Sequence, residues 1–413
     1  MQTRIMATVL ALLCASAVRA QDAVPVIRAH SRVVTITDGL HVKKNYWYVM
    51  PDKRPDVYFV EIPLEPHTVT FTTDVESIRI PVTYGSQHEF VIRLDDGVEA
   101  RTQVRAAFRN LLSYRRTGPA PAGGVDTIPF TLGGNDKIYV KGRINGGPVL
   151  DFQFDLGAGG SVIKKGSVAK VRMQFDGTAR LRNSDGDNVV ASSSANRLEV
   201  AGLAWDTVPF VVADNMTWRE DALIGNTLFQ DKVLEIDYDR MVIAIHDTLP
   251  ALSPEWSRQD MILDGVVPYV RGRLDVYDSP RDGWFLLDTG AYTSILNSEQ
   301  LWASSKVAGE MWHLLTGRHR GPALWVAGRM FGKPNYSVGP YSGDRSALGL
   351  LGNDVLKRFN LVIDNRRGFA YFRPNHHLAE SFRNPEYYLV RVLALAVLAV
   401  GVAASWFVRR RRA

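Results

Sequence analysis

The stretch FQFDLGAGGS at residues 152–161 recurs as FLLDTGAYTS at residues 285–294. In both stretches an apolar run ends at an aspartate, Asp155 or Asp288, and the pattern DxGAxxS begins there. A short apolar run bounded by a turn signal predicts a strand leading into a loop. A chain that makes two such loops can place two carboxylates face to face.

The similarity continues on both sides of the two aspartates. Upstream, YVKGR at residues 139–143 returns as YVRGR at residues 269–273, and downstream LIGNTLF at residues 223–229 returns as LLGNDVL at residues 350–356. The interval from Asp155 to Asp288 is nearly the same as the interval from Gly225 to Gly352. A nearly constant offset across several blocks indicates a duplicated domain. We name its two halves the first repeat, residues 125–248, and the second repeat, residues 249–375.

The duplicated DxGA loops and the later apolar-apolar-Gly-Asn segments resemble the aspartic proteases, in their retropepsin-like branch, over about residues 125 to 375. That family carries one catalytic aspartate per lobe and works as a homodimer or as two fused lobes. The resemblance implies a mostly β, bilobal acid protease fold with one lobe per repeat. It also implies that Asp155 and Asp288 are the catalytic pair and that a peptide or protein is the substrate.

The resemblance assigns supporting roles around the pair. These residues are Gly157, Ala158, Ser161, Gly225, Thr289, Gly290, Ala291, Ser294 and Gly352. By analogy, the Thr289 hydroxyl bonds to the backbone of the opposite lobe, and the glycines of the apolar segments lie beneath the loops where a side chain would collide. Leu156 occupies the position where the family has Thr or Ser. It cannot form the corresponding hydrogen bond.

Two carboxylates about 3 Å apart share one proton, because both cannot ionise comfortably together. One then acts as acid and the other as base toward water and a peptide carbonyl, with no metal or cofactor. The titration belongs to the pair, so the sequence leaves open which aspartate plays which role. Ala158 and Ala291 provide no hydroxyl that could donate a hydrogen bond to the ionised carboxylates. The charged form is then less stabilised and the pKa values of the pair are higher, so we expect a pH optimum in the mildly acidic to neutral range.

The charge balance does not favour a nucleic-acid partner. The formal net charge is +6, but residues 409–412 alone contribute four arginines, so the excess is largely a property of the tail. The single cysteine, Cys14, lies in the N-terminal apolar segment. We expect this segment to be removed as a signal peptide, which leaves a mature chain without cysteine. We therefore expect neither disulfides nor cysteine chemistry there.

Both termini carry apolar segments. Residues 1–20, with Arg4, an apolar run and the small-residue motif VRA at 18–20, predict a secretory signal peptide. The apolar run at residues 392–408 is followed by the basic tail 409–413 and preceded by a juxtamembrane segment at 376–391. It predicts a transmembrane helix, with a sorting signal that is cut off after export as the alternative. The expectation is an exported, membrane-anchored monomer of a bacterial envelope or periplasm.

Residues 21–116 predict an N-terminal β domain resembling a small sandwich, with strands near 57–62, 68–72, 78–82 and 90–94 and a short helix at 104–114. The segment TGPAPAGG at 117–124 predicts a linker. In the first repeat, residues 180–190 predict a polar hairpin placed like a protease flap. The second repeat shows no comparable hairpin in residues 314–328. Short helices are expected near 165–171 and 298–304, and after Gly225 and Gly352.

Two other classes of function compete with a protease. Leu156 is compatible with a catalytically impaired, peptide-binding protein, and the N-terminal β domain with an envelope-binding module. Cleavage of peptides that is blocked by a statine-type transition-state mimic distinguishes the protease from both. The pair His376 and His377 has no third ligand near it in sequence, so we expect no metal there.

Overall fold

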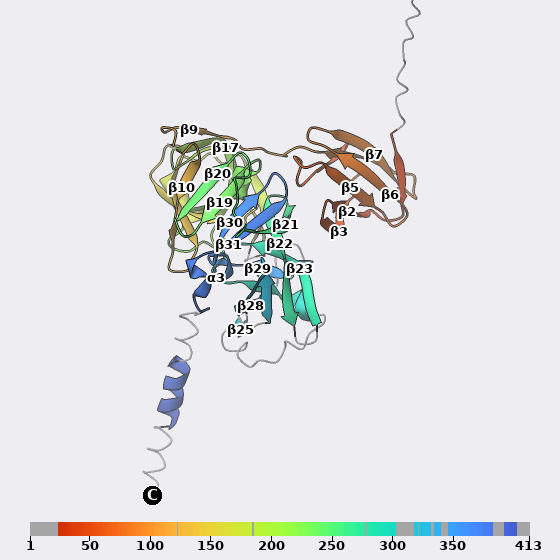
Figure 1. Cartoon of the computed structure of the whole chain (residues 1–413). Helices are drawn as coiled ribbons and strands as arrows, with labels where there is room; N and C mark the ends of the chain where they lie inside the picture. Colours follow the sequence, from red (N-terminus) through yellow and green to blue (C-terminus); the bar gives the residue numbers. More distant parts are fainter. Residues whose placement is uncertain are drawn as a thin grey trace, which may run out of the picture.

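The computed structural model describes residues 24–121, 123–183, 186–276, 279–302, 318–320, 322–331, 334–339, 346–382 and 392–402. These residues are mostly β (Figure 1), which confirms the fold class at this level. The predicted signal peptide and basic tail lie outside the described residues.

The N-terminal domain consists of two four-stranded sheets. The first contains β1 (Val26–Ala29), β7 (Gln87–Leu94), β8 (Glu99–Arg105) and β4 (Asp56–Phe59), and the second contains β3 (His41–Tyr48), β2 (Val33–Asp38), β5 (His67–Thr72) and β6 (Ser77–Val82). Every second residue along β2 is buried, as expected for a strand with one face toward a core. Phe71 and Phe90 meet between the sheets with ring centroids 4.9 Å apart. One apolar core is shared by both sheets, as in a sandwich.

The prediction of a short helix at residues 104–114 is wrong. Strand β8 continues to Arg105, residues 106–113 are irregular, and β9 (Tyr114–Arg116) pairs with a strand of the first repeat. The apolar residues of this segment belong to two cores: Val104 and Ala106 pack in the N-terminal domain, whereas Leu112 and Tyr114 pack against the core of the repeats.

The first repeat forms a nine-stranded sheet. Its strands are β11 (Thr131–Leu132), β12 (Ile138–Ile144), β13 (Leu150–Asp155), β18 (Ala222–Gly225), β14 (Ser161–Lys164), β17 (Leu203–Ala213), β16 (Gly186–Val200) and β15 (Gly177–Asn183), with β9 beside β17. Strands β15 and β16 form the predicted hairpin. Asn145 and Gly146 have positive φ in the tight turn between β12 and β13, a conformation that Asn and Gly adopt readily.

A larger sheet of 14 strands among the described residues joins the two repeats. Its path is β10 (Asp126–Pro129), β20 (Val242–His246), β19 (Val233–Asp237), β30 (Phe359–Asp364), β31 (Phe369–Pro374), β21 (Ser257–Asp264), β22 (Val267–Val276), β23 (Ser279–Leu287), β29 (Gly349–Leu351), β24 (Ile295–Asn297), β28 (Asn335–Gly339) and β25 (Arg318–Arg320). Strand β26 (Ala323–Val326) pairs with β22 and forms a hairpin with β27 (Arg329–Phe331). This hairpin was missed in the sequence.

The short helices follow the predicted positions. They are the 3-10 helices η1 (Lys165–Lys170) and η2 (Asn226–Phe229) and the α-helices α1 (Ser298–Trp302) and α3 (Asn353–Leu356). A further 3-10 helix, η3 (His376–Ala379), was not predicted. Residues 303–304 of one predicted helix lie outside the described residues. Residues 392–402 are also helical. None of the helices in the described ranges is long and apolar enough to cross a membrane, and residues 403–408 of the predicted span are not described.

The two repeats use the same strand pairings. Strand β13 is antiparallel to β12 and parallel to β18, and β23 is likewise antiparallel to β22 and parallel to β29. Strands β14 and β24 repeat the pattern, each antiparallel to one neighbour and parallel to the next. The duplicated sequence therefore builds a duplicated local topology.

Strands β19 and β30 join the repeats by antiparallel pairing in which Glu235 lies opposite Val362, its own equivalent in the second repeat. Such self-pairing is what a two-fold axis between the repeats produces. Two buried hydrogen bonds obey the same relation: the Asn226 amide donates to the Asn365 side chain at 2.9 Å, and the Tyr238 hydroxyl donates to Asn353 at 2.8 Å.

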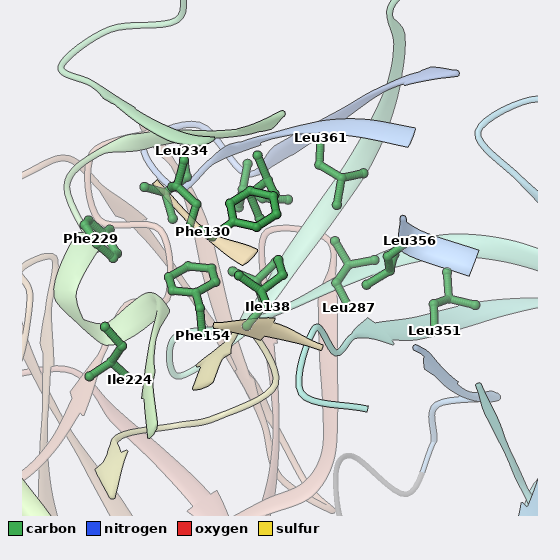
Figure 2. Packing of buried hydrophobic residues seen from close by; sticks show 14 of the residues in the cluster. Phe130, Ile138, Phe154, Ile224, Phe229, Leu234, Leu287, Leu351, Leu356 and Leu361 are labelled. Carbon is green, nitrogen blue, oxygen red and sulfur yellow. The ribbon is translucent and has the colours of Figure 1, made fainter. Parts of the chain in front are cut away.

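A single apolar core spans this junction. Figure 2 shows Phe154 and Leu287, the residues before the two aspartates, in the same cluster as Phe229, Leu234 and Leu361. Both aspartates are thus anchored at ends of strands whose preceding side chains are fully buried.

A buried ion pair of the N-terminal domain, Lys43 with Glu61, lies where that domain contacts the second repeat. The Lys43 ammonium bonds to Glu61 and lies 3.8 Å from the Asp264 carboxylate, and the Lys43 side chain is 2% exposed. Burial raises the pKa of Glu61 to about 7, against the attraction of Lys43. Beside them, Ile62 packs so closely on Gly368 that a Cβ there would lie 2.3 Å from its Cδ1.

We expect Lys43→Met to destabilise the protein by about 3–5 kcal/mol, because it leaves Glu61 buried without its partner. Since Glu61 ionises as the pH rises through about 7, the loss should be larger at pH 8 than at pH 5. Thermal unfolding at both pH values measures it. The double variant Lys43→Met/Glu61→Leu removes the uncompensated charge and should recover most of the loss; equal loss in both variants would contradict the ion-pair explanation.

Candidate active site

Asp155 is the last residue of β13, and Asp288 directly follows β23. The neighbouring parallel strand places Gly225 opposite Asp155, and the Asp288 amide donates to the Leu351 carbonyl at 3.0 Å. Equivalent strand pairs therefore hold both aspartates at the same point of each repeat. We call residues 155–161 and 288–294 the two aspartate loops.

Close approach across the repeats explains the loop glycines. A Cβ on Gly157 would lie 2.8 Å from Asp288 Cγ, and a Cβ on Gly290 would lie 2.3 Å from Asp155 Oδ2. Each glycine thus faces the aspartate of the other repeat, and the two carboxylates adjoin. Neither glycine has positive φ, so both are required here by space rather than by backbone conformation.

Loop amides donate to both carboxylates. The Gly157 amide donates to Asp155 Oδ1 at 2.7 Å. Asp288 Oδ1 accepts two amides, from Gly290 at 2.9 Å and from Ala291 at 2.8 Å. These bonds favour the ionised form, and Asp288 receives one more of them than Asp155.

Burial of the pair makes double ionisation unfavourable. Burial, followed by the adjacent Asp288 charge, raises the pKa of Asp155 well above its usual range. Burial also raises the pKa of Asp288, opposed by hydrogen bonds from Asp155 and the loop amides. Two adjacent carboxyls with raised pKa values retain one proton between them over a wide pH range, and their titration belongs to the pair.

Thr289 ties the two aspartate loops together. Its hydroxyl donates to the Phe154 carbonyl at 2.9 Å and accepts the Leu156 amide at 3.0 Å. Asn353 in turn donates to the Thr289 carbonyl at 2.7 Å. The Leu156 side chain is fully buried in the common core. Thr289 thus supplies hydrogen bonds from one aspartate loop to the strand and loop of the other repeat, whereas its equivalent, Leu156, contributes apolar packing.

Restoring a hydroxyl at position 156 should therefore destabilise the protein. We expect Leu156→Thr to lower the free energy of unfolding by about 1–3 kcal/mol, because it loses buried apolar contacts and buries a hydroxyl among them. Leu156→Met keeps the volume and should lose less than about 1.5 kcal/mol. Thermal melting compares the two variants. A Thr variant as stable as the wild type would show that the new hydroxyl forms a second set of hydrogen bonds with the opposite aspartate loop.

Gly225 and Gly352 lie beneath the aspartate loops, as expected. A Cβ on Gly225 would lie 2.3 Å from the Asp155 carbonyl oxygen, and one on Gly352 would lie 2.7 Å from the Thr293 carbonyl oxygen. These contacts are with backbone atoms, which cannot move aside as a flexible side chain would. Any side chain at either position would displace an aspartate loop.

The two loop serines have different surroundings. The Ser294 hydroxyl donates to Asp354 at 2.8 Å and accepts the Gly352 amide, whereas the buried Ser161 hydroxyl has no partner among the described residues. Burial raises the pKa of Asp354 to about 6. Asp354 was missed in the sequence, although it is a visible difference between the repeats, because the first repeat has Thr227 at that position.

Two further aspartates, Asp237 and Asp364, occupy equivalent positions in the two repeats. Asp237 and Asp364 each accept backbone amides in the turn that follows their strand, which agrees with a structural role. His376 and His377 pair with Asp239 and Glu380, respectively. Within the described ranges no group of three or more His, Cys, Asp or Glu side chains is arranged to hold a metal.

Comparison with known families gives one match. Residues 140–228 match the model of the aspartyl protease family, a range that contains Asp155, Leu156 and Gly225 but ends before Asp288. A search of curated proteins found no match to the chain. The chain therefore contains an aspartyl protease-like domain, which in general supports a protease function.

Proposed function

We propose that the protein is an aspartic endopeptidase of the retropepsin-like type, with the two repeats as fused lobes and Asp155 and Asp288 as its catalytic residues. The observation that carries this proposal is the close approach of each loop glycine to the opposite aspartate. A Cβ would lie 2.8 Å from that aspartate at Gly157 and 2.3 Å from it at Gly290. Because one chain supplies both carboxylates, the proposed site is complete in a monomer.

In the proposed reaction, the ionised carboxylate of the pair takes a proton from a water molecule. That water attacks the peptide carbonyl carbon, and the protonated carboxyl donates its proton to the carbonyl oxygen. The proton taken from water then passes to the leaving amine as the C–N bond breaks. The other carboxylate takes back its proton from the carbonyl-derived hydroxyl as the new carboxyl product forms, so the pair returns to its singly protonated state. The hydrogen bonds of the Thr289 hydroxyl hold the two aspartate loops at a fixed separation during these proton transfers.

The proposed flap is the β15–β16 hairpin of the first repeat, which extends from the same sheet as Asp155. In this proposal it covers an extended peptide lying across the two aspartates. The raised pKa values of the pair favour activity in the mildly acidic to neutral range, because the singly protonated state then persists to higher pH than for ordinary carboxyls.

A peptide library incubated with the purified protein from pH 3 to 8 tests the proposal. We expect internal cleavage with a bell-shaped pH profile and inhibition by a statine-containing peptide, which places a hydroxyl between the carboxylates. Binding of library peptides without cleavage at any pH would favour the peptide-binding alternative. Cleavage that the statine compound does not inhibit would contradict the aspartate mechanism.

We also propose that the protein is exported, on the basis of the signal-like residues 1–20. Cell fractionation followed by mass spectrometry of the N-terminus tests this. Mature protein beginning near Gln21 outside the cytoplasm is expected. Retention of Met1 in the cytosolic fraction would contradict export without affecting the proposed chemistry.

A further inference from the structure

A buried polar cluster lies on one side of the aspartate pair. The Lys137 ammonium is 3.2 Å from both Gln153 Oε1 and Glu220 Oε1. The Gln153 amide nitrogen is 3.5 Å from Asp155 Oδ2, and it would lie 2.4 Å from a Cβ on Gly290, so it touches both aspartate loops. We name Lys137, Gln153 and Glu220 the polar triad.

The surroundings of the triad fix its charges. Glu220 also accepts the Tyr139 hydroxyl at 3.1 Å and the Thr217 amide at 2.7 Å, and its pKa is lowered despite burial, chiefly by Lys137. The Arg219 guanidinium stacks on the Tyr139 ring at 4.3 Å. Side chains of Lys137 and Glu220 are only 14% and 2% exposed. The triad therefore contains an ion pair, Lys137 with Glu220, that is largely shielded from water. Charges act over longer distances there than in water.

The equivalent positions of the second repeat carry apolar residues instead of this cluster. The residues equivalent to Lys137, Gln153 and Glu220 are Val267, Leu286 and Ala347. All three belong to one small apolar cluster beside the Asp288 strand. Equivalent strands thus place an ion pair and an amide beside Asp155, and three apolar side chains beside Asp288.

We propose that Lys137 is a positioning residue for the aspartate pair, which orients Asp155 through Gln153 and whose charge sets the pH range in which the pair works. This inference rests on the proposed protease function. Burial raises the pKa values of Asp155 and Asp288, and the positive charge of Lys137 opposes that rise at both aspartates. Glu220, whose carboxylate lies 3.2 Å from the Lys137 ammonium, opposes that charge.

Two single variants should have opposite effects. Lys137→Met removes a positive charge, so both limbs of the pH profile of kcat/KM should move to higher pH by about one unit. Glu220→Gln leaves the Lys137 charge uncompensated, so both limbs should move to lower pH. Lys137→Arg keeps the charge and should restore the profile. A purely structural role would lower activity or melting temperature in both variants without opposite shifts.

The second repeat supplies a matched replacement. The triple variant Lys137→Val/Gln153→Leu/Glu220→Ala copies residues that already pack together at the equivalent positions, so it should fold and should show the upward shift of Lys137→Met. Gln153→Leu alone keeps the charge and should lower kcat with a smaller shift. Lys141→Met, which removes an exposed lysine from β12, is the control and should leave the profile unchanged.

Carbon-13 NMR titration of the aspartate carboxyls provides a readout that needs no substrate. If the wild type cleaves nothing, the proposed function fails, whereas opposite shifts of the Asp155 and Asp288 titrations in Lys137→Met and Glu220→Gln would still support the role of Lys137. Unchanged titrations and pH profiles in Lys137→Met and in the folded triple variant would overturn it, as would shifts in the same direction.

Discussion

Either single substitution Asp155→Asn or Asp288→Asn is expected to reduce peptide cleavage by at least about 10³-fold, and the double variant should lose little more. Each asparagine removes a group that must exchange a proton, and the remaining aspartate then has no partner with which to share one. The close approach of Gly157 and Gly290 to the opposite carboxylates motivates this non-additivity. Initial rates with one identified substrate peptide measure it.

Asp237→Asn is the matched control for that experiment. Asp237 accepts the Arg240 amide at 2.9 Å in a turn, and an asparagine oxygen can accept the same bond. The control should keep activity within a few fold of the wild type. If Asp155→Asn kept most of the activity, the pairing of Asp155 with Asp288 inside one chain would be the wrong site, and pairing of Asp288 between two chains would explain the result better.

Thr289→Val is expected to lower the free energy of unfolding by about 2–5 kcal/mol. Valine preserves the shape but leaves the Phe154 carbonyl and the Leu156 amide without their buried partner, and each unsatisfied group costs about 1–3 kcal/mol. Chemical denaturation measures the change. Thr289→Ser keeps the hydroxyl and should lose less than about 1.5 kcal/mol. Equal losses in both variants would assign the effect to the methyl group instead.

The sequence predicted those parts of the site that occur twice. Asp155, Asp288 and the glycines beneath them appear in matched blocks, and the position of each depends on its immediate neighbours in a strand or loop. Their spacing was therefore sufficient to place them. The β15–β16 hairpin was predicted for a similar reason, since its turn signal is local.

Features that depend on distant segments were not predictable in this way. Lys137, Gln153 and Glu220 come from three separate segments of the chain and meet only because β12, β13 and the start of β18 adjoin in the sheet. From the sequence, Leu156 was interpreted as the loss of a hydrogen bond between the lobes. Its burial is visible only in the structure, where both repeats contribute to one core. Sequence alone could have suggested Gln153, because it interrupts an apolar strand that has Leu286 at the equivalent position.

The missed β26–β27 hairpin did have a signal in the sequence. The tripeptide VAG occurs at residues 200–202 and again at 326–328, and both copies turn with positive φ at the alanine and the glycine. In both repeats the strand before this turn pairs with the YVxGR strand, β12 in one case and β22 in the other. The short motif was overlooked because the surrounding residues differ.

The pairing of β19 with β30 has a consequence for how the chain is made. When the first repeat leaves the ribosome, β19 (Val233–Asp237) is hydrogen-bonded to β20 on one side, but its other edge has no partner until almost the whole second repeat, up to β30, has been synthesised. At about 5–20 residues per second, this interval lasts roughly 6–25 s. During that time an apolar strand edge is available to any passing strand, including that of a neighbouring nascent chain. Slow synthesis of the second repeat should therefore favour misassembly between molecules over correct closure within one.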